Sequence, residues 1–315
     1  MSSSVVEKKK MACVTGGNGY IASALIKMLL ENGYAVKTTV RNPDDMSKNS
    51  HLKNLKALGH LEVLRADLDQ EGSFDEAVAG CHYAFLVAAP KDVIEPAVRG
   101  TLNVMRSCAR ARTLRRVILT SSSAGVYIRP ELPQQGDDDD GHVVLDEDSW
   151  SDVEYLRAEK PPLWWAYCVS KVLLEKAACR FAEEHGISLV TICPVVTVGE
   201  APAPVVNTSV PLCLSFLTGN EALLAALKGI EKTSGGVQLV HVDDLCRAEL
   251  FVAEEAAAAG STDDDEQLLE KPRVSLSSAK LVGEGFEFKY KTLDEIYGDV
   301  VRRVRQGTGN SALLI

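Results

Sequence analysis

Hydrophobic and polar positions follow two alternating patterns along residues 11–194. Short runs of apolar, mainly β-branched residues are typical of buried strands, and they occur at 11–15, 34–41, 61–68, 83–90, 115–123 and 187–194. The segments between them have the apolar spacing that predicts helices, at 20–33, 51–59, 73–80 and 92–111 and in the segment with Tyr167 and Lys171. Strands that alternate with helices form βαβ units with parallel pairing. Residues 11–194 are therefore predicted to form a doubly wound α/β domain, a Rossmann fold.

The remaining residues, 195–315, follow a less regular pattern. We expect them to form a smaller, irregular substrate-binding lobe, with one strand–helix unit at 236–255 that returns to the Rossmann core. Within the first domain, residues 129–160 are polar, and the pattern predicts an irregular connection there. Ser73 precedes a short helical pattern and is predicted to be its N-cap.

The turn after the first predicted strand is rich in glycine. The stretch "VTGGNGYIAS" spaces Gly16, Gly19 and Ala22 as G-x-x-G-x-x-A and joins that strand to the first helix. Glycines let the backbone turn tightly and approach a phosphate, and the helix N-terminus carries a partial positive charge that favours an anion. A plain structural turn is the alternative. The position within a βαβ unit favours a dinucleotide-binding loop.

The end of the second predicted strand carries cations. NAD-binding proteins usually have an acidic residue there, which holds the ribose 2′-hydroxyl. This chain has Arg41 instead, with Lys48 further on. Two cations without a carboxylate suit a 2′-phosphate and predict NADPH, and a pair of ordinary surface cations is the alternative. The third strand ends in "ADL" (66–68), where adenine would lie, and the fourth in "VAAP" (87–90), where small residues permit backbone contact with the cofactor.

The stretch "WAYCVSK" places Tyr167 and Lys171 four positions apart, on one face of a helix. A free tyrosine has a pKa of about 10, and a neighbouring ammonium lowers it, so this pair can handle a proton near neutral pH. The fifth strand ends in "LTSSSAG", at the sheet edge where ligands bind in this architecture, and a hydroxyl there can bind a substrate oxygen. Each feature has an ordinary structural alternative, but their combination on a cofactor-binding scaffold favours catalysis.

Composition and charge argue against several other classes of protein. The chain of 315 residues has a formal net charge of −10, which disfavours a nucleic-acid partner. Its eight cysteines include no C-x-x-C, and its six histidines have no metal-ligand spacing. We therefore expect reduced thiols, a cytoplasmic location and no metal. The N-terminal residues and the interrupted apolar runs predict neither a secretory signal nor a membrane span. No feature specifies an oligomeric state.

Eight stretches of the chain carry a resemblance to a known family. They are "ACVTGGNGYIASALIKMLL", "TTVRNPDD", "FLVAAP", "RRVILTSS", "DEDSWSDVEYL", "AYCVSKVLLEKAA", "LTGNE" and "HVDDLCRAELFVAE". With them the chain resembles the extended short-chain dehydrogenase/reductase family and, within it, the plant flavonoid reductases. "GGNGYIAS" and "VAAP" look more like the anthocyanidin reductases than the dihydroflavonol reductases. The resemblance covers most of 11–255 and again 270–300.

This resemblance implies an NADPH-dependent reductase that transfers a hydride to a small flavonoid, converting an anthocyanidin to a flavan-3-ol. Dihydroflavonol or flavanone 4-reduction is the alternative, and a non-catalytic NADP-binding regulatory protein is a remoter one. A nucleotide-sugar epimerase or dehydratase on the same fold would keep NAD bound, which Arg41 and Lys48 disfavour. Two regions, after Pro90 and after Gly260, are shorter than the family pattern. Both are expected near the mouth of the substrate pocket.

The resemblance also implies roles for particular residues. Ser122, Tyr167 and Lys171 match the catalytic triad, with Ser123 as the alternative serine. Substrate contacts are expected from Ser122 and from Tyr127, Trp164 and Trp165, although either tryptophan is equally consistent with a core position. The residues expected to bind the cofactor are Gly16, Asn18, Gly19, Tyr20, Ile21, Arg41, Lys48, Asp67, Leu68, Val87, Ala88, Ala89, Pro90, Tyr167, Lys171 and Pro194.

Overall fold

A computed structural model describes residues 9–88, 94–130, 143–161, 164–204, 209–234, 236–255 and 274–305 of the chain. Several features predicted above lie outside these residues. They are the N-terminal residues 1–8, Ala89 and Pro90, the acidic runs at 137–140 and 263–266, and the junctions after Pro90 and Gly260.

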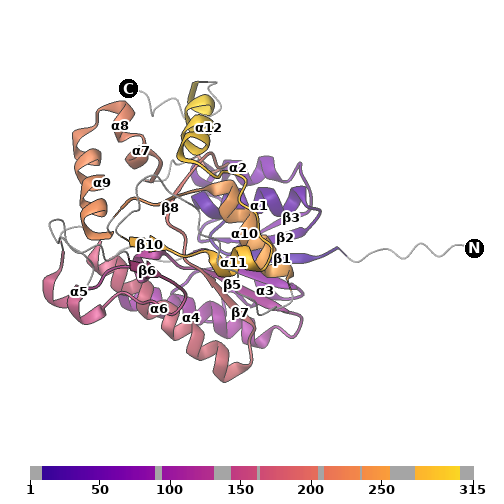
Figure 1. The fold of residues 1–315 in the computed structure, drawn as a ribbon. Coiled ribbons are helices and arrows are strands. Elements are labelled where there is room, and N and C mark those ends of the chain that lie inside the picture. Colours follow the sequence, from indigo (N-terminus) through magenta and orange to yellow (C-terminus); the bar gives the residue numbers. More distant parts are fainter. Residues whose placement is uncertain are drawn as a thin grey trace, which may run out of the picture.

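A parallel sheet of six strands, in the order β3-β2-β1-β4-β5-β7, lies at the centre of the fold (Figure 1). The chain starts in the middle of this sheet, adds β2 and β3 on one side, and then crosses to add β4, β5 and β7 on the other. This order confirms the doubly wound α/β architecture, and it places a ligand crevice beyond the carboxyl ends of β1 and β4. The strands are β1 Met11–Val14, β2 Ala35–Val40, β3 Leu61–Arg65, β4 Tyr83–Leu86, β5 Arg116–Thr120 and β7 Leu189–Ile192.

Helices cover both faces of the sheet. Alternate residues of a strand point to opposite faces, so Val14 and Phe85 pack under α1, α2 and α10, whereas Cys13 and Ala84 pack under α3, α4 and α6. All four of these side chains are fully buried. The helices are α1 Tyr20–Glu31, α2 Met46–Leu55, α3 Asp75–Val78, α4 Ile94–Arg110, α6 Trp165–His185 and α10 Val242–Glu254.

The stretch 129–160 is not irregular throughout, so that prediction is wrong for its second half. It contains β6 (Val143–Leu145) and α5 (Val153–Glu159), and α5 is capped by the Asp152 carboxylate, which accepts the Tyr155 N–H at 2.9 Å. The strand β6 pairs in parallel with β10 (Val274–Leu276), far away in the sequence. Its partner is too distant for a local pattern to reveal.

Ser73 does not cap α3, which corrects a second prediction. Its hydroxyl instead donates to the carbonyl of Asp67 at 2.8 Å and accepts the Asp67 N–H at 3.1 Å. The residue before α3 is Phe74, whose side chain is buried and makes no capping hydrogen bond. A serine at this place therefore fixes the end of β3 instead of starting a helix.

A smaller group of elements lies beside the sheet. We call them the C-terminal lobe: β8 (Val196–Val198), α7 (Ser209–Cys213), α8 (Ser215–Thr218), α9 (Glu221–Ser234), β9 (Leu239–His241) and α12 (Leu293–Arg305). The strand β9 pairs with β8 and not with the six-stranded sheet, while α10 follows β9 directly and packs on α1 and β5. The 3₁₀ turn η1 (Ser123–Gly125) and α11 (Ala279–Gly283) complete the described elements. The division of the chain at residue 194 stays a prediction.

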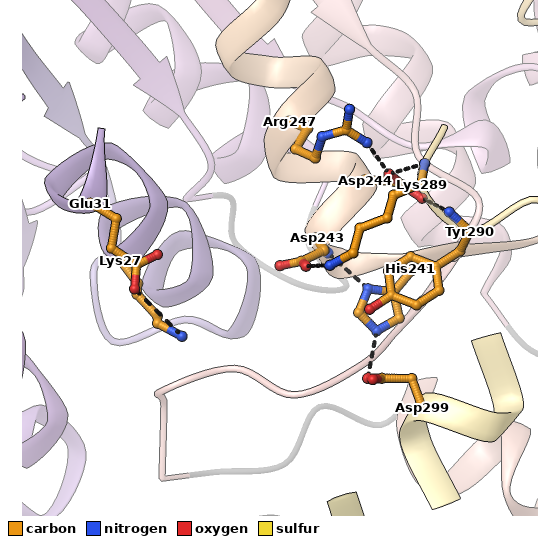
Figure 2. Close-up of polar contacts among 9 residues, drawn as sticks. All are labelled: Lys27, Glu31, His241, Asp243, Asp244, Arg247, Lys289, Tyr290 and Asp299. Atoms are coloured by element: carbon orange, nitrogen blue, oxygen red, sulfur yellow. Dashed lines mark hydrogen bonds and ion pairs between the residues drawn. The ribbon is translucent and has the colours of Figure 1, made fainter. Parts of the chain in front are cut away.

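Side chains at the start of α10 fasten the lobe to the sheet, in a group that we call the α10 clamp (Figure 2). The buried Asp244 carboxylate accepts the backbone N–H groups of Lys289 and Tyr290, both at 2.8 Å. The His241 ring stacks on Tyr290, with centroids 3.9 Å apart, and its Nε2 lies 3.3 Å from Asp299 Oδ2 on α12. A carboxylate that satisfies two backbone donors is strongly anchored, so the clamp holds the segment before α12 against the start of α10.

All eight cysteines are free thiols, and six of them are buried. Burial is the main cause of a raised pKa at every one of them. Within the described ranges, no helix is long and apolar enough to cross a membrane. In the same ranges, no cluster of three or more His, Cys, Asp or Glu side chains could hold a metal ion.

Candidate active site

The loop between β1 and α1 brings the backbone close to the end of β4. Gly16 has φ +73°, and a Cβ there would lie 2.8 Å from the Cβ of Ala88, so only glycine fits this position. The Gly19 N–H donates to the Gly16 carbonyl at 2.8 Å and closes the turn, and Asn18 lies within it. No side chain caps α1, and its first turn, with Tyr20 and Ile21, has no acidic residue. These features fit the pyrophosphate of a dinucleotide.

The Tyr20 side chain is directed away from this loop. Its hydroxyl donates to the Gly199 carbonyl at 2.7 Å, and its ring packs against both the sheet core and the core of the C-terminal lobe. Desolvation raises the pKa of this phenol far above its ordinary value. Only the backbone of Tyr20 is therefore placed to meet a phosphate, and its side chain joins the lobe to the cofactor loop.

Arg41 lies at the end of β2 and Lys48 at the start of α2. Arg41 directly follows the strand, is exposed and forms no ion pair within the described residues. Lys48 lies in the first turn of α2, where its Nζ is 3.3 Å from Asp45 Oδ2. Because Asp45 already shares the charge of Lys48, Arg41 is the stronger candidate for holding a phosphate.

The ends of β3 and β4 are held by short side chains. Asp67 and Leu68 are both partly exposed, and the Leu68 carbonyl accepts the Asn103 side-chain amide at 2.8 Å. Val87 and Ala88 do not extend β4, because their N–H groups both donate to the hydroxyl of Thr15, each at 3.0 Å. Thr15 ends the first buried run in the sequence, and reasoning from the sequence overlooked its role. Ala89 and Pro90 lie outside the described residues.

Lys171 is the buried cation of the site. Its side chain is 6 % exposed, and its Nζ donates to the Thr120 carbonyl at 3.4 Å and lies 5.6 Å from the centroid of the Tyr167 ring. Burial lowers the pKa of Lys171 to about 8, and the charge of the nearby Glu175 partly opposes this effect. The ammonium is therefore mainly charged at neutral pH, which favours the phenolate form of Tyr167. The predicted tyrosine–lysine unit is brought together by α6.

Three further predicted residues lie around the end of β5. Ser122 is partly exposed, and its Oγ accepts the Ala124 N–H at 3.3 Å, whereas Ser123 is buried. The Ser123 N–H donates to the Pro194 carbonyl at 3.0 Å, which holds the end of β7 against η1. Among these serines, Ser122 is thus the more accessible hydroxyl. The turn η1 also packs against α6, since a Cβ on Gly125 would be 3.7 Å from the Lys171 Cβ.

The expected substrate residues have different surroundings. Trp164 is 46 % exposed, has φ +76°, and meets the Tyr167 ring edge-on with centroids 6.1 Å apart. Trp165 and Tyr127 are partly buried in the same apolar cluster as Tyr167. Desolvation raises the pKa of Tyr127 well above its ordinary value. An exposed aromatic ring beside Tyr167 suits a flat aromatic ligand, whereas Trp165 has the packing of a core residue.

Residues 12–264 match the NAD dependent epimerase/dehydratase family, and the chain belongs to this family. The resemblance derived from the motifs is thereby confirmed. Its similarity to known reductases covers nearly the whole chain. The protein is therefore an NAD(P)-dependent oxidoreductase that uses a nicotinamide cofactor.

Plant enzymes are among the most similar proteins. The chain is 43 % identical to an anthocyanidin reductase ((2S)-flavan-3-ol-forming) from Vitis vinifera, over 93 % of this chain and 94 % of that enzyme. It is 38 % identical to a dihydroflavonol 4-reductase from Callistephus chinensis, over 91 % of this chain and 85 % of the relative. The Vitis vinifera alignment has 328 positions, more than the 315 residues of this chain, so parts of that enzyme have no counterpart here.

Solved structures share the fold. Vestitone reductase from alfalfa (Medicago sativa L.) has a TM-score of 0.76 and 33 % identity, with 95 % of this chain and 99 % of that chain covered. Yeast methylglyoxal/isovaleraldehyde reductase complexed with NADPH has a TM-score of 0.69 over 95 % of this chain and 99 % of that chain, at 18 % identity. The second likeness concerns the fold alone.

Proposed function

We propose that this protein is a cytoplasmic, NADPH-dependent reductase of flavonoids, and that an anthocyanidin is its substrate. The observation that carries the proposal is the buried Lys171 beside the Tyr167 ring, at the ligand-binding edge of the sheet. The chain that forms this site is 43 % identical to an anthocyanidin reductase. The identity supports the substrate class, and the side chains support a proton-handling step.

NADPH would supply the hydride: one for a ketone substrate, and two, from two NADPH molecules in turn, to convert an anthocyanidin cation to a flavan-3-ol with one proton. The loop closed by Gly16 and Gly19 would hold its pyrophosphate at the start of α1. Arg41, helped by Lys48, would hold the 2′-phosphate, because Arg41 directly follows β2 and its guanidinium forms no ion pair within the described residues, whereas Lys48 is paired with Asp45. The exposed side chain of Arg41 can reach an anion at low desolvation cost.

Tyr167 would give the one proton that the reduction requires, to the carbonyl oxygen of a ketone or to the ring of an anthocyanidin after the first hydride. The nearby ammonium of Lys171 would stabilise the phenolate that is left when this proton is transferred. Ser122, at the end of β5, would hold the same oxygen, and Trp164 would cover one face of the flavonoid. For a ketone substrate the same groups would produce an alcohol, so a 4-reductase is the alternative.

A turnover assay of the purified protein tests this proposal. Cyanidin, dihydroquercetin and naringenin would each be offered with NADPH and with NADH, and the products would be separated by chromatography. We expect a flavan-3-ol from cyanidin and a preference for NADPH. Turnover of dihydroquercetin or naringenin alone would favour the 4-reductase. Reduction of none of them would favour a regulatory NADP-binding protein, and a preference for NADH would contradict the role of Arg41.

A further inference from the structure

A buried carboxylate lies one helical turn beyond Lys171. Glu175 is 8 % exposed, and its position four residues after Lys171 places it on the same side of α6. Burial raises the pKa of Glu175, while the charge of Lys171 and nearby hydrogen-bond donors act in the opposite direction. A carboxylate kept in such a place needs partners, because an unpaired buried charge is strongly destabilising.

The partners of Glu175 belong to the two strand ends that form the site. The Cys193 thiol donates to both carboxylate oxygens, at 3.6 and 3.8 Å, and Cys193 directly precedes Pro194. The Cys193 thiol has its pKa raised to about 12 by burial, so it stays protonated and remains a donor. The buried hydroxyl of Ser121 faces the same carboxylate, although it makes no hydrogen bond of ordinary geometry. Ser121 directly precedes Ser122.

We propose that Glu175 is a positioning residue of the active site: an ionised carboxylate that keeps Lys171 charged and holds the segments with Ser122 and Pro194 in place. The proposal rests on the function proposed above, since it concerns the tyrosine–lysine unit of that site. The titratable groups that face this carboxylate are Lys171 and Cys179 on α6 and Cys193 after β7. Only Lys171 among them carries a charge at neutral pH, so its protonation is what Glu175 changes.

The sign of the effect follows from the charges. A negative carboxylate favours the ammonium form of Lys171 and raises its pKa, so removal of that charge lowers the pKa of Lys171 further. A neutral Lys171 no longer favours the phenolate of Tyr167. The enzyme without Glu175 would therefore lose its active form at a lower pH.

The test measures the pKa of Lys171 directly in the full-length protein. Lysine labelled with ¹³C at Cε would be followed by NMR through a pH titration, and the Lys171 signal would be identified by its loss in Lys171→Arg. We expect Glu175→Gln to lower the pKa of Lys171 by about one unit, the lower end of the range for a nearby opposite charge. Glu175→Asp keeps the charge and should retain most of the original value.

Glu249 supplies the matched control. It is a buried glutamate close to β5 as well, where its Oε1 accepts the Thr120 hydroxyl at 2.7 Å, but it is not among the groups that shift the pKa of Lys171. Glu249→Gln should leave that pKa unchanged. An unchanged pKa of Lys171 in Glu175→Gln would overturn the proposal, and so would an equal shift of that pKa in both variants.

A second measurement joins the inference to turnover. The fall of kcat at high pH should begin about one unit lower in Glu175→Gln, with the KM for the flavonoid nearly unchanged. A purely structural role would lower kcat equally at every pH. If the wild-type protein reduces no flavonoid, the proposed function fails, and the NMR titration still decides whether Glu175 controls Lys171.

Discussion

The six-stranded sheet and the C-terminal lobe keep their shapes by different means. Strands of four to six residues form the sheet, and each strand from β3 to β7 is hydrogen-bonded to its neighbour. A buried apolar cluster packs on each face of this sheet. The lobe has one ladder of three residue pairs between β8 and β9, and its position depends on the α10 clamp and on the Tyr20 hydroxyl. Cofactor-binding geometry is thus set by the backbone, whereas lobe geometry depends on side-chain contacts to the sheet and on an apolar cluster of its own.

This difference teaches where substitutions should act. A change at the sheet edge that spares the backbone should alter chemistry and leave stability intact. A change in the clamp should loosen the lobe and weaken substrate binding, while the cofactor site persists. The following three variants separate these effects, and the first has the largest expected consequence.

Tyr167→Phe removes the proton donor from the sheet edge. Turnover of a carbonyl substrate should fall by about 10²–10⁴-fold, the usual contribution of general acid catalysis. NADPH affinity, measured by fluorescence titration, should stay within about twofold, because the ring and Lys171 remain. Tyr155→Phe is the matched control, since Tyr155 packs in the same apolar cluster and has no role in the proposed chemistry. Full turnover in Tyr167→Phe would exclude this residue as the donor.

Asp244→Asn weakens the α10 clamp. The neutral amide accepts hydrogen bonds less strongly, its NH₂ group faces one of the two backbone donors, and the ion pair with Arg247 is lost. We expect the free energy of unfolding to fall by about 2 kcal/mol, with a raised KM for the flavonoid and unchanged NADPH affinity.

Asp243→Asn is the control for this variant. The neighbouring Asp243 carboxylate forms its ion pair with Lys289 at the surface, so this substitution should lower the free energy of unfolding by less than about 1 kcal/mol. Thermal unfolding of both proteins makes the comparison. A loss of NADPH affinity in Asp244→Asn would show that the lobe and the cofactor site are not separable.

Tyr20→Phe has the smallest expected effect and concerns the junction itself. It deletes the hydrogen bond to the Gly199 carbonyl and keeps the ring, so the loss should be about 1 kcal/mol. Tyr34→Phe removes a hydroxyl that bonds Glu254 near the other end of α1. Urea unfolding should show similar losses for both variants, and only Tyr20→Phe should raise the KM for the flavonoid. Equal KM values in the two variants would mean that the Tyr20 hydroxyl does not affect binding of the flavonoid.

The sheet was predictable because its strands are short, continuous apolar runs, such as "MACVT". Runs of this kind are typical of parallel strands that are buried on both faces. The tyrosine–lysine unit was predictable because both residues belong to one helix. The pairing of β6 with β10 was not, since it depends on a contact between distant segments. The direction of the Tyr20 side chain and the partners of Glu175 likewise depend on tertiary packing. Only the four-residue spacing between Lys171 and Glu175 gave a local signal for the latter.

The buried thiols determine how this protein meets reactive chemicals. Sulfur attacks an electrophile as a thiolate, and the raised pKa of all eight cysteines leaves very little thiolate at neutral pH. Polyphenols oxidise to quinones, which are electrophiles that capture thiolates. A fold that keeps all eight thiols protonated and buries six of them should therefore react slowly with oxidised forms of the compounds that we propose it handles.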